Sequence, residues 1–393
     1  MDITVDFGLN EQQSSIRDMV RRFGAKELAP GYLARAKVAE FPWKQHRRVA
    51  ELGLLGMLAG PEWDGEEKPD FESVGIMMEE LAYADFNIAN CVLPPLIITS
   101  IMKEHAVRRL QEEWMPAIVS GERMVALGLT EPGSGSDAAG MRTKAVKTES
   151  GWRLNGEKTS ITAIPWSTAA IIFAKTQSAS GAAGVSAFFV EMDRPGVTMS
   201  LTPDPGWLPV GRGTISMVDV DIPADALIGG EGEGFRTVMN NFDFTRPLLA
   251  LTGIGCAQAS IDEAVEHARH REVFGSTLSK FEGISFPLAE HTVHLESARL
   301  ICYKALWKRT QGLPHTADAA MAKWIGPLVS GRAIHDALLT FGNFGYASEY
   351  PHEQRLRDTL AVEIADGTAQ VQKIIIAREL FGRDFVPYDT KRP

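Results

Sequence analysis

The apolar positions in the first third of the chain recur at the spacing of an α-helix. One stripe consists of Ile16, Met19, Val20, Phe23 and Leu28. Asn10 precedes this stripe and Gln13 follows three residues later, which is the pattern of a helix-capping box. A second stripe of the same period occupies residues 74–82. These patterns predict a helical domain over residues 1–124.

The periodicity changes near Met124. Short apolar runs bounded by turn residues follow at residues 152–156, 169–174, 186–190 and 214–222. The last run alternates apolar and polar positions and stops before a proline, as a half-buried strand does. We therefore expect a β domain over residues 125–232.

The helical period returns at about residue 234 and continues to about residue 385. Breaks near Gly275, residues 312–314 and residues 342–345 divide this part into four long segments. Four antiparallel segments joined by short turns are typical of a four-helix bundle, predicted here over residues 233–393. The GEGEG run at residues 230–234 is interpreted as the linker from the β domain into the bundle. The fold class is therefore α+β and multidomain.

Bulk properties narrow the functional classes. A chain of 393 residues is too long for one ordinary hydrophobic core, so two or three domains are expected. The formal charge of -10 argues against nucleic acid or an anionic membrane as a partner. No apolar run reaches the roughly 18 residues of a membrane span, and residues 1–6 lack the features of a signal peptide. Three widely spaced cysteines suit a reducing compartment, so a cytoplasmic location is expected.

The run LTEPGSGSD at residues 129–137 is the most specific segment of the chain. Its Gly, Ser and Thr residues expose backbone N–H groups and hydroxyls, which suit a phosphate or the edge of a heterocycle. On composition alone, a glycine- and serine-rich loop solvated by water is an equal interpretation.

This run resembles a motif of the acyl-CoA dehydrogenase family, and the resemblance extends from about residue 8 to 385. It implies a barrel-like central domain and one FAD per subunit. Thr130 would bond the isoalloxazine edge, and Ser136 would lie between the flavin and the coenzyme A thioester. The run NGEKTSIT at residues 155–162 resembles the strand whose final residue, here Thr162, bonds flavin N5. Ser160 stands where most members have an aromatic residue that covers the flavin.

Later motifs continue the resemblance in the same order. Asp243 and Arg246 in FDFTR match the helix start that grips pantetheine and the CoA phosphates. The run REVFG resembles a turn that reaches a neighbouring subunit's flavin, and the run FGNFGY resembles a turn at the adenosine half of FAD. The cofactor contacts implied by these two runs are Arg271, Phe274, Leu339, Gly342 and Asn343. Because the first turn needs a partner's pyrophosphate, the resemblance implies a homotetramer.

The last motif is DGTAQ at residues 366–370, where most family members have Glu in place of Asp. The resemblance makes Asp366 the base that removes the α-proton of an acyl-CoA while flavin N5 accepts the β-hydride. Gly367 would contact the substrate, and Thr368 and Gln370 would contact the cofactor. Electrons would then leave to an electron-transfer flavoprotein or a similar carrier.

The aspartate is one methylene shorter than glutamate, which removes about 1.5 Å of reach. A bulky acyl group whose α-carbon is pushed toward the base compensates for this, so an alicyclic or branched substrate is expected. With Asp at this position and KTSIT at residues 158–162, the chain resembles cyclohexanecarboxyl-CoA and related alicyclic dehydrogenases. It also resembles nitroalkane oxidase, so a flavin oxidase of the same fold and a non-catalytic flavin or acyl-CoA-binding protein stay open as alternatives.

Two further features, Asp85 and a pair of His-x-x-His motifs, suggest additional site residues. Asp85 lies in a helical region that lines the acyl pocket of relatives, so it is a candidate second base in the substrate site; a capping Asp is the simpler interpretation. The two His-x-x-His pairs at residues 267–270 and 291–294 suggest a metal site. A di-metal bundle requires Glu-x-x-His pairs instead, so no metal is predicted.

Overall fold

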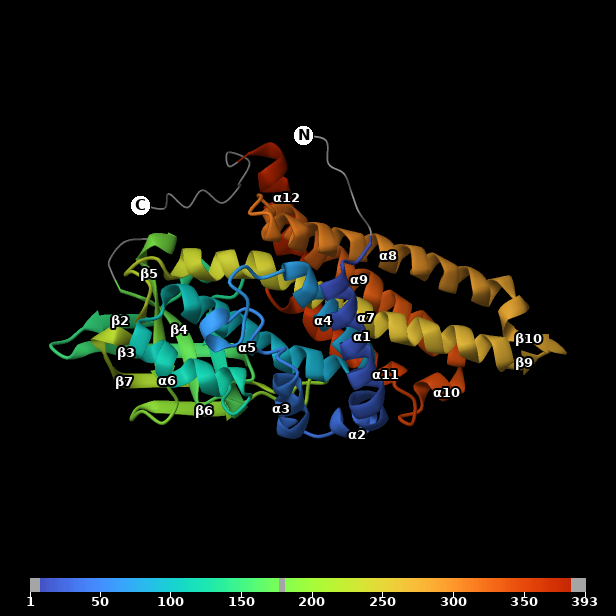
Figure 1. Ribbon diagram of the computed structural model, residues 1–393, viewed down its shortest axis with the longest axis horizontal. Coiled ribbons are helices and arrows are strands. Elements are labelled where there is room, and N and C mark those ends of the chain that lie inside the picture. The colour runs from blue at the N-terminus through green and yellow to red at the C-terminus, as the bar shows by residue number, and fades with distance from the viewer. Residues whose placement is uncertain (1–7, 177–180, 383–393) are drawn as a thin grey trace.

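The computed structural model describes residues 8–176 and 181–382, and its sheet lies at one end of the molecule beside helices from both ends of the chain (Figure 1). The N-terminal helices are α1 (Glu11–Phe23), α2 (Tyr32–Arg35), α3 (Trp43–Glu51), α4 (Phe71–Ala84), α5 (Phe86–His105) and α6 (Arg108–Val119). The predicted capping box of α1 is confirmed. The Gln13 backbone N–H donates to the Asn10 side chain at 2.8 Å, and the Asn10 N–H donates to the Gln13 side chain at 3.1 Å.

The helix α5 is long and apolar enough, by length and composition, to cross a membrane. In the fold it runs through the interior, and 83% of its most apolar window is buried. Burial inside the protein therefore accounts for its composition. The sequence predicted no apolar run of this length, and Pro94 and Pro95 interrupt the stretch, yet both prolines lie inside the helix.

The central domain is one eight-stranded sheet. Its strands are β1 (Val125–Gly128), β2 (Lys144–Lys147), β3 (Gly151–Thr162), β4 (Ala169–Lys175), β5 (Val185–Glu191), β6 (Val197–Leu201), β7 (Arg212–Pro223) and β8 (Leu227–Ile228). They are ordered β6-β7-β3-β2-β4-β5-β8, and β1 pairs with β4 in parallel. The four strands predicted from apolar runs are confirmed as β3, β4, β5 and β7.

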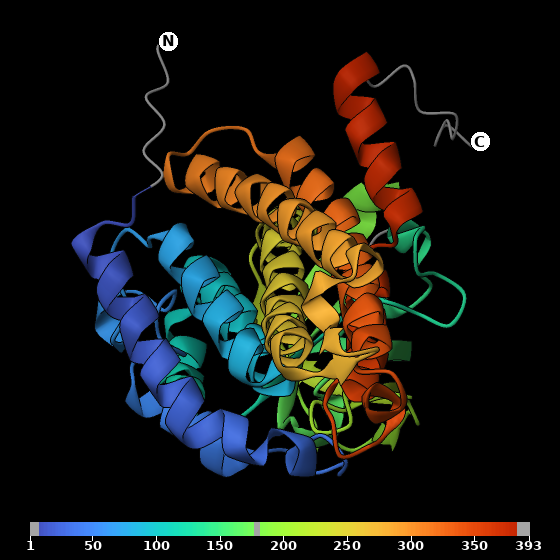
Figure 2. The same cartoon turned by 90° about the vertical axis from the view of Figure 1, so that its right-hand side faces the viewer.

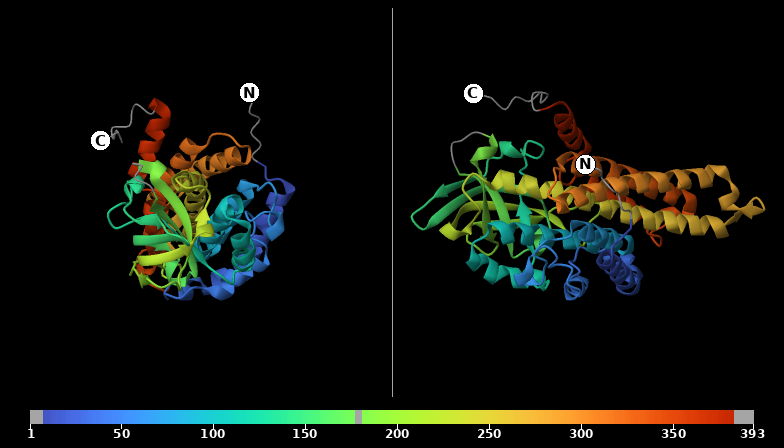
Figure 3. Two further views of the ribbon diagram at one scale, coloured as in Figure 1. Left: turned by 90° about the vertical axis from the view of Figure 1, so that its left-hand side faces the viewer. Right: turned by 45° about the horizontal axis from the view of Figure 1, so that its top comes forward.

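The sheet curls around a core of its own. On β5, Phe188 packs against Trp152 of β3 with ring centroids 5.1 Å apart, inside the sheet. The next residue, Phe189, points to the other side and packs on Trp114 of α6 at 4.8 Å. Because successive residues of a strand face opposite sides, β5 contributes to both cores. The result is the expected barrel-like domain with helices on its outer face (Figure 3).

The C-terminal domain is built from α7 (Gly234–His270), α8 (Glu282–Thr310), α9 (Thr316–Phe341), α10 (Asn343–Tyr346), α11 (His352–Ile364) and α12 (Ala369–Phe381). The three predicted breaks are confirmed. The prediction that the fourth segment is a single helix is wrong, because this segment divides into α11 and α12. Asp366 and Gly367 have φ angles of 52° and 99°, which end the helix and turn α12 away from the bundle (Figure 2).

The buried carboxylate of Asp358 connects the N-terminal helices, the central domain and the C-terminal helices. Asp358 on α11 is 1% exposed, and it accepts hydrogen bonds from Asn87 on α5 and from the Trp207 backbone N–H, each at 2.9 Å. Gln354 donates to it as well, at 2.9 Å. The two helical domains also share one apolar core with residues from α4, α5 and α7. This packing fixes the α11–α12 turn relative to the sheet.

Candidate active site

A buried ion pair supports the loop that follows β1. Lys158 on β3 is fully buried and donates to the Glu131 carboxylate and to the Leu129 carbonyl, each at 2.9 Å. Glu131 also accepts from the backbone N–H groups of Arg142 at 2.6 Å and Thr143 at 2.8 Å. The glycine- and serine-rich residues beyond Glu131 therefore project from a rigid base. This pair was not predicted from the sequence, although Glu131 stands in one of the two motifs predicted to line the flavin and Lys158 stands in the other.

The sequence-predicted flavin contacts Thr130, Ser160 and Thr162 lie in adjacent segments. The Thr159 backbone N–H donates to the Thr130 carbonyl at 2.9 Å, which joins the loop to the end of β3. The hydroxyls of Thr130, Ser136 and Thr162 have no hydrogen-bond partner among the residues that the structure describes, and all three residues are at least partly exposed. They are therefore available to a ligand.

Ser160 adopts an unusual backbone conformation, with a φ of 57° at an irregularity in the pairing of β3 with β7. Its hydroxyl accepts a hydrogen bond from Arg212 at 3.2 Å, and Arg212 is paired with Asp204 through its Nε at 2.9 Å. A polar serine–arginine contact thus occupies the position where the resemblance led us to look for an aromatic cover.

Five other predicted cofactor residues lie away from the sheet, at the far end of the helical domain. Arg271 and Phe274 belong to the hairpin of β9 (Glu272–Val273) and β10 (Ser276–Thr277), at the far tip of α7 in Figure 1. Phe274 is 97% exposed. The ring of His267 stacks on Phe341 with centroids 4.2 Å apart, which brings this tip beside the turn that contains Leu339, Gly342 and Asn343. The chain therefore presents two separate sets of predicted FAD contacts.

Asp366 lies between α7 and α12, where its carboxylate Oδ2 accepts a hydrogen bond from the Thr245 hydroxyl. Burial raises the pKa of Asp366, while the Thr245 hydrogen bond and the positive charges of Arg246 and Lys323 lower it. The net direction is upward. Neither Oδ1 nor the backbone N–H of Asp366 has a hydrogen-bond partner within the described part of the chain. A proton acceptor and a hydrogen-bond donor are thus both available at one residue.

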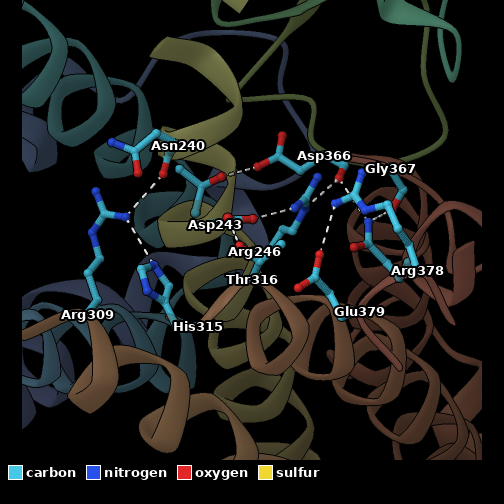
Figure 4. Close-up of polar contacts among 12 residues, drawn as sticks. Asn240, Asp243, Arg246, Arg309, His315, Thr316, Asp366, Gly367, Arg378 and Glu379 are labelled. Atoms are coloured by element: carbon cyan, nitrogen blue, oxygen red, sulfur yellow. Dashed lines mark hydrogen bonds and ion pairs between the residues drawn. The ribbon is translucent and has the colours of Figure 1, made fainter. Parts of the chain in front are cut away.

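Side chains from three helices contact the carbonyls of this turn, and Lys323 of α9 is one of them, at 3.4 Å from the Gly367 carbonyl. Gln372 of α12 is buried and donates to the carbonyls of Asp366 at 3.0 Å and Gly367 at 2.9 Å. Arg246 of α7 donates to the Asp366 carbonyl at 3.3 Å (Figure 4). Thr368 and Gln370 begin α12, with the Thr368 hydroxyl unpaired among the described residues and Gln370 exposed.

Asp243 and Arg246, the predicted contacts of pantetheine and the CoA phosphates, form an ion pair beside the Asp366 turn. Arg246 is 5% exposed and pairs with Asp243 at 2.8 Å, and the second Asp243 oxygen accepts from Thr316 at 2.5 Å (Figure 4). Their role toward coenzyme A stays a prediction. The structure adds that Arg246 also contacts the carbonyl of Asp366.

Asp85 has the contacts of a structural residue. It caps α5 by accepting from the N–H groups of Asn87 at 3.0 Å and Ile88 at 3.2 Å, and it pairs with Arg35 at 2.7 Å. Burial raises the pKa of Asp85 to about 6, and Arg35 opposes this shift. With a fully buried carboxylate engaged in these bonds, the geometry favours the capping interpretation over a second base.

Three residues at the Asp366 turn escaped the sequence analysis, namely Thr245, Lys323 and Gln372. Thr245 stands inside the FDFTR run, so its position next to Arg246 was a usable signal. A cavity of about 1480 Å³ lies elsewhere, between α1, α4, α7 and α8. No predicted site residue lines it. Within the described ranges, no three His, Cys, Asp or Glu side chains are grouped as metal ligands.

The chain matches three consecutive models of the acyl-CoA dehydrogenase family: the N-terminal domain at residues 10–122, the middle domain at 126–220 and the C-terminal domain at 232–381. It is 31% identical over 385 residues to the short-chain-specific acyl-CoA dehydrogenase of Clostridium acetobutylicum, covering 96% of this chain and 100% of that protein. The solved butyryl-CoA dehydrogenase of Megasphaera elsdenii is 32% identical with a TM-score of 0.91, covering 96% and 100% of the two chains. The chain therefore belongs to the acyl-CoA dehydrogenase family.

Within that family it is an FAD-dependent acyl-CoA dehydrogenase, an oxidoreductase. The fold is also similar to a structure described as the FAD complex of PigA, with a TM-score of 0.92 and 28% identity over 96% of this chain and 100% of that one. The residues present fit the cofactor. The unpaired hydroxyls at Thr130, Ser136 and Thr162 offer partners to a flavin edge, and a Cβ at Gly133 would meet no atom within 4 Å.

Proposed function

We propose that this enzyme introduces a Cα=Cβ double bond into an acyl-CoA thioester, with Asp366 as the base that removes the α-proton. The observation that carries this proposal is the Asp366 turn. It places an unpaired carboxylate oxygen and an unpaired backbone N–H on the same residue, and burial raises the pKa of the carboxyl group.

The α-proton of a thioester is weakly acidic, so its removal needs both a base and stabilisation of the developing enolate oxygen. The Asp366 backbone N–H donates to that oxygen, and Asp366 Oδ1 takes the proton. The Thr245 hydroxyl holds Oδ2, which fixes the direction of Oδ1. Arg246 and Gln372 hold the carbonyl of the same residue, so the carboxylate approaches the substrate from a rigid turn.

Bound FAD would supply the acceptor for the hydride that leaves Cβ. Thr130, Ser136, Ser160 and Thr162 would hold its isoalloxazine end. The substrate would give one proton to Asp366 and one hydride to the cofactor, and an electron-transfer flavoprotein or a similar carrier would accept the two electrons. A solved neighbour of the chain is described as the electron-transferring flavoprotein of Acidaminococcus fermentans.

The second set of predicted FAD contacts serves a partner subunit. Arg271 and Phe274 lie at the far tip of α7, away from the isoalloxazine residues of the same chain. An exposed Arg on a hairpin tip suits the pyrophosphate of a flavin in a neighbouring copy. We therefore propose a homotetramer in which each cofactor is shared between two subunits.

The preferred acyl group follows from the length of the base. The carboxylate of Asp366 reaches about 1.5 Å less far than that of a glutamate. This difference matters because a misplacement of about 1 Å can lower a rate 100-fold. A ring or branch at Cα brings the proton closer to Asp366. We propose an alicyclic or branched substrate, whereas the relatives named above are described as short-chain or butyryl-CoA enzymes.

Anaerobic mixing of the holoenzyme with a panel of thioesters tests the substrate class. Cyclohexanecarboxyl-CoA is expected to bleach the flavin at least about 10-fold faster than butyryl-CoA, since the shorter base reaches its α-proton better. Stopped-flow absorbance measures both rates. Faster bleaching by butyryl-CoA would contradict the alicyclic proposal.

Two controls identify the runner-up, a flavin oxidase of the same fold. Nitroethane replaces the thioester in one control, and oxygen is admitted to the reduced enzyme in the other. Bleaching by nitroethane alone, followed by rapid reoxidation in oxygen, would establish an oxidase and reject the dehydrogenase.

A further inference from the structure

Lys323 is a buried cation without a carboxylate partner. It lies on the inner face of α9 and is 1% exposed, and no carboxylate oxygen of the described residues is within 4.0 Å of its ammonium. Its hydrogen-bond partner is the Gly367 carbonyl at 3.4 Å. The other fully buried lysine, Lys158, has Glu131 at 2.9 Å. A buried charge left without an ion-pair partner is unfavourable for folding, which points to a role at the neighbouring turn.

We propose that Lys323 is a positioning residue for Asp366, holding the Asp366–Gly367 turn in place and keeping the Asp366 carboxylate ionised for proton abstraction. This inference rests on the proposed function, in which Asp366 is the base.

The positional part of this role follows from the backbone. Asp366 and Gly367 both have positive φ, a conformation that a non-glycine residue such as Asp366 keeps only when its surroundings hold it there. Three donors from three helices hold the two carbonyls: Arg246 from α7, Lys323 from α9 and Gln372 from α12. Lys323 is the donor that ties the turn to α9.

The electrostatic part follows from the charges around the carboxylate. The charges that act on it are those of Arg246 on α7 and Lys323 on α9. Further charges act on these two cations: Asp243 and Arg378 on Arg246, and Glu363 on Lys323. Arg246 is already paired with Asp243, so Lys323 is the less compensated of the two cations near Asp366. Burial lowers the pKa of Lys323 to about 8, and the negative charge of Asp366 opposes this shift.

The test compares the pH dependence of anaerobic flavin reduction in Lys323→Gln, Lys323→Met and wild-type holoenzyme between pH 5 and 8. Removing the positive charge removes an effect that lowers the pKa of Asp366. Since the base acts as the carboxylate, the midpoint of the rate profile is expected to move upward by about one pH unit in both variants. The apparent KM for the thioester should change less than kcat.

Gln372→Met is the matched control, because it removes hydrogen bonds to the same carbonyls without changing any charge. It should lower the rate but leave the midpoint within about 0.2 pH units of the wild type, and Lys323→Arg should restore the wild-type midpoint. Both Lys323 substitutions remove a buried unpaired charge, so the holoenzyme is expected to fold. An unmoved midpoint in Lys323→Gln and Lys323→Met would overturn the proposal, whatever happens to their rates.

A second readout separates this inference from the proposed function. Infrared titration of the substrate-free holoenzyme follows the protonated carboxyl band that disappears in Asp366→Asn. The band should titrate about one pH unit higher in Lys323→Gln than in the wild type. If wild-type flavin is not bleached by any thioester, the proposed function fails, and the infrared midpoint still decides the role of Lys323.

Discussion

Replacing Asp366 with Asn is expected to lower the rate of flavin reduction by an acyl-CoA between about 100-fold and 10,000-fold, the usual contribution of a general base. Asn has the same shape and can still accept the Thr245 hydrogen bond, but it cannot take a proton. The variant should therefore remain yellow and bind the thioester. Anaerobic stopped-flow absorbance measures the bleaching rate, and the spectral change on ligand binding measures the affinity.

Asp366→Glu is the control for this substitution. It keeps a carboxylate and lengthens it by one methylene, so it should retain base function and shift the preference toward straight-chain thioesters. If Asp366→Asn reduces its flavin at the wild-type rate, the base is another residue and the mechanism is wrong.

The largest effect on stability is expected from Lys158→Met. This substitution leaves the Glu131 carboxylate buried without its cation, and breaking a buried ion pair from one side costs about 3–5 kcal/mol. Because Glu131 also binds the backbone of residues 142 and 143, the flavin-lining loop loses its support and FAD affinity should fall. Chemical denaturation measures the free energy of unfolding, and flavin titration of the apoprotein measures the affinity.

A surface pair provides the comparison. Arg153 and Asp221 are 2.8 Å apart but solvent-exposed, so Arg153→Met should change the free energy of unfolding by less than about 1 kcal/mol. A double variant, Glu131→Gln with Lys158→Met, should recover part of the stability lost by the single change. Equal small effects of Lys158→Met and Arg153→Met would show that the buried pair is not the support of the loop.

Much of the fold was predictable from the sequence because long amphipathic segments and apolar runs reflect burial directly. The four predicted strands have buried, apolar positions, whereas β6 was missed because its residues, including Met199 and Leu201, are largely exposed. The division between α11 and α12 was missed as well. In the sequence, a single glycine, Gly367, indicates this division. The positive φ of Asp366 depends on tertiary contacts, which a local sequence pattern does not report.

The candidate site was predictable where residues are adjacent in sequence and unpredictable where helices meet. The DGTAQ run pointed to Asp366, but its partners Thr245 and Lys323 come from α7 and α9, more than 40 residues away. The same limitation applies to Arg246, for which the resemblance implied a contact with the substrate. Its burial beside Asp243 and its hydrogen bond to the Asp366 carbonyl are properties of helix packing that the FDFTR run does not report.

The central claim is that Asp366 removes the proton from Cα of a CoA thioester as the flavin is reduced. The most direct measurement is a single anaerobic turnover of the wild-type holoenzyme with cyclohexanecarboxyl-CoA deuterated at Cα, with the product analysed by mass spectrometry. The account predicts a bleached flavin and an unsaturated thioester that has lost the deuterium from Cα together with one hydrogen from Cβ. A bleached flavin with the Cα deuterium still in the product, or a flavin that stays oxidised, would contradict it.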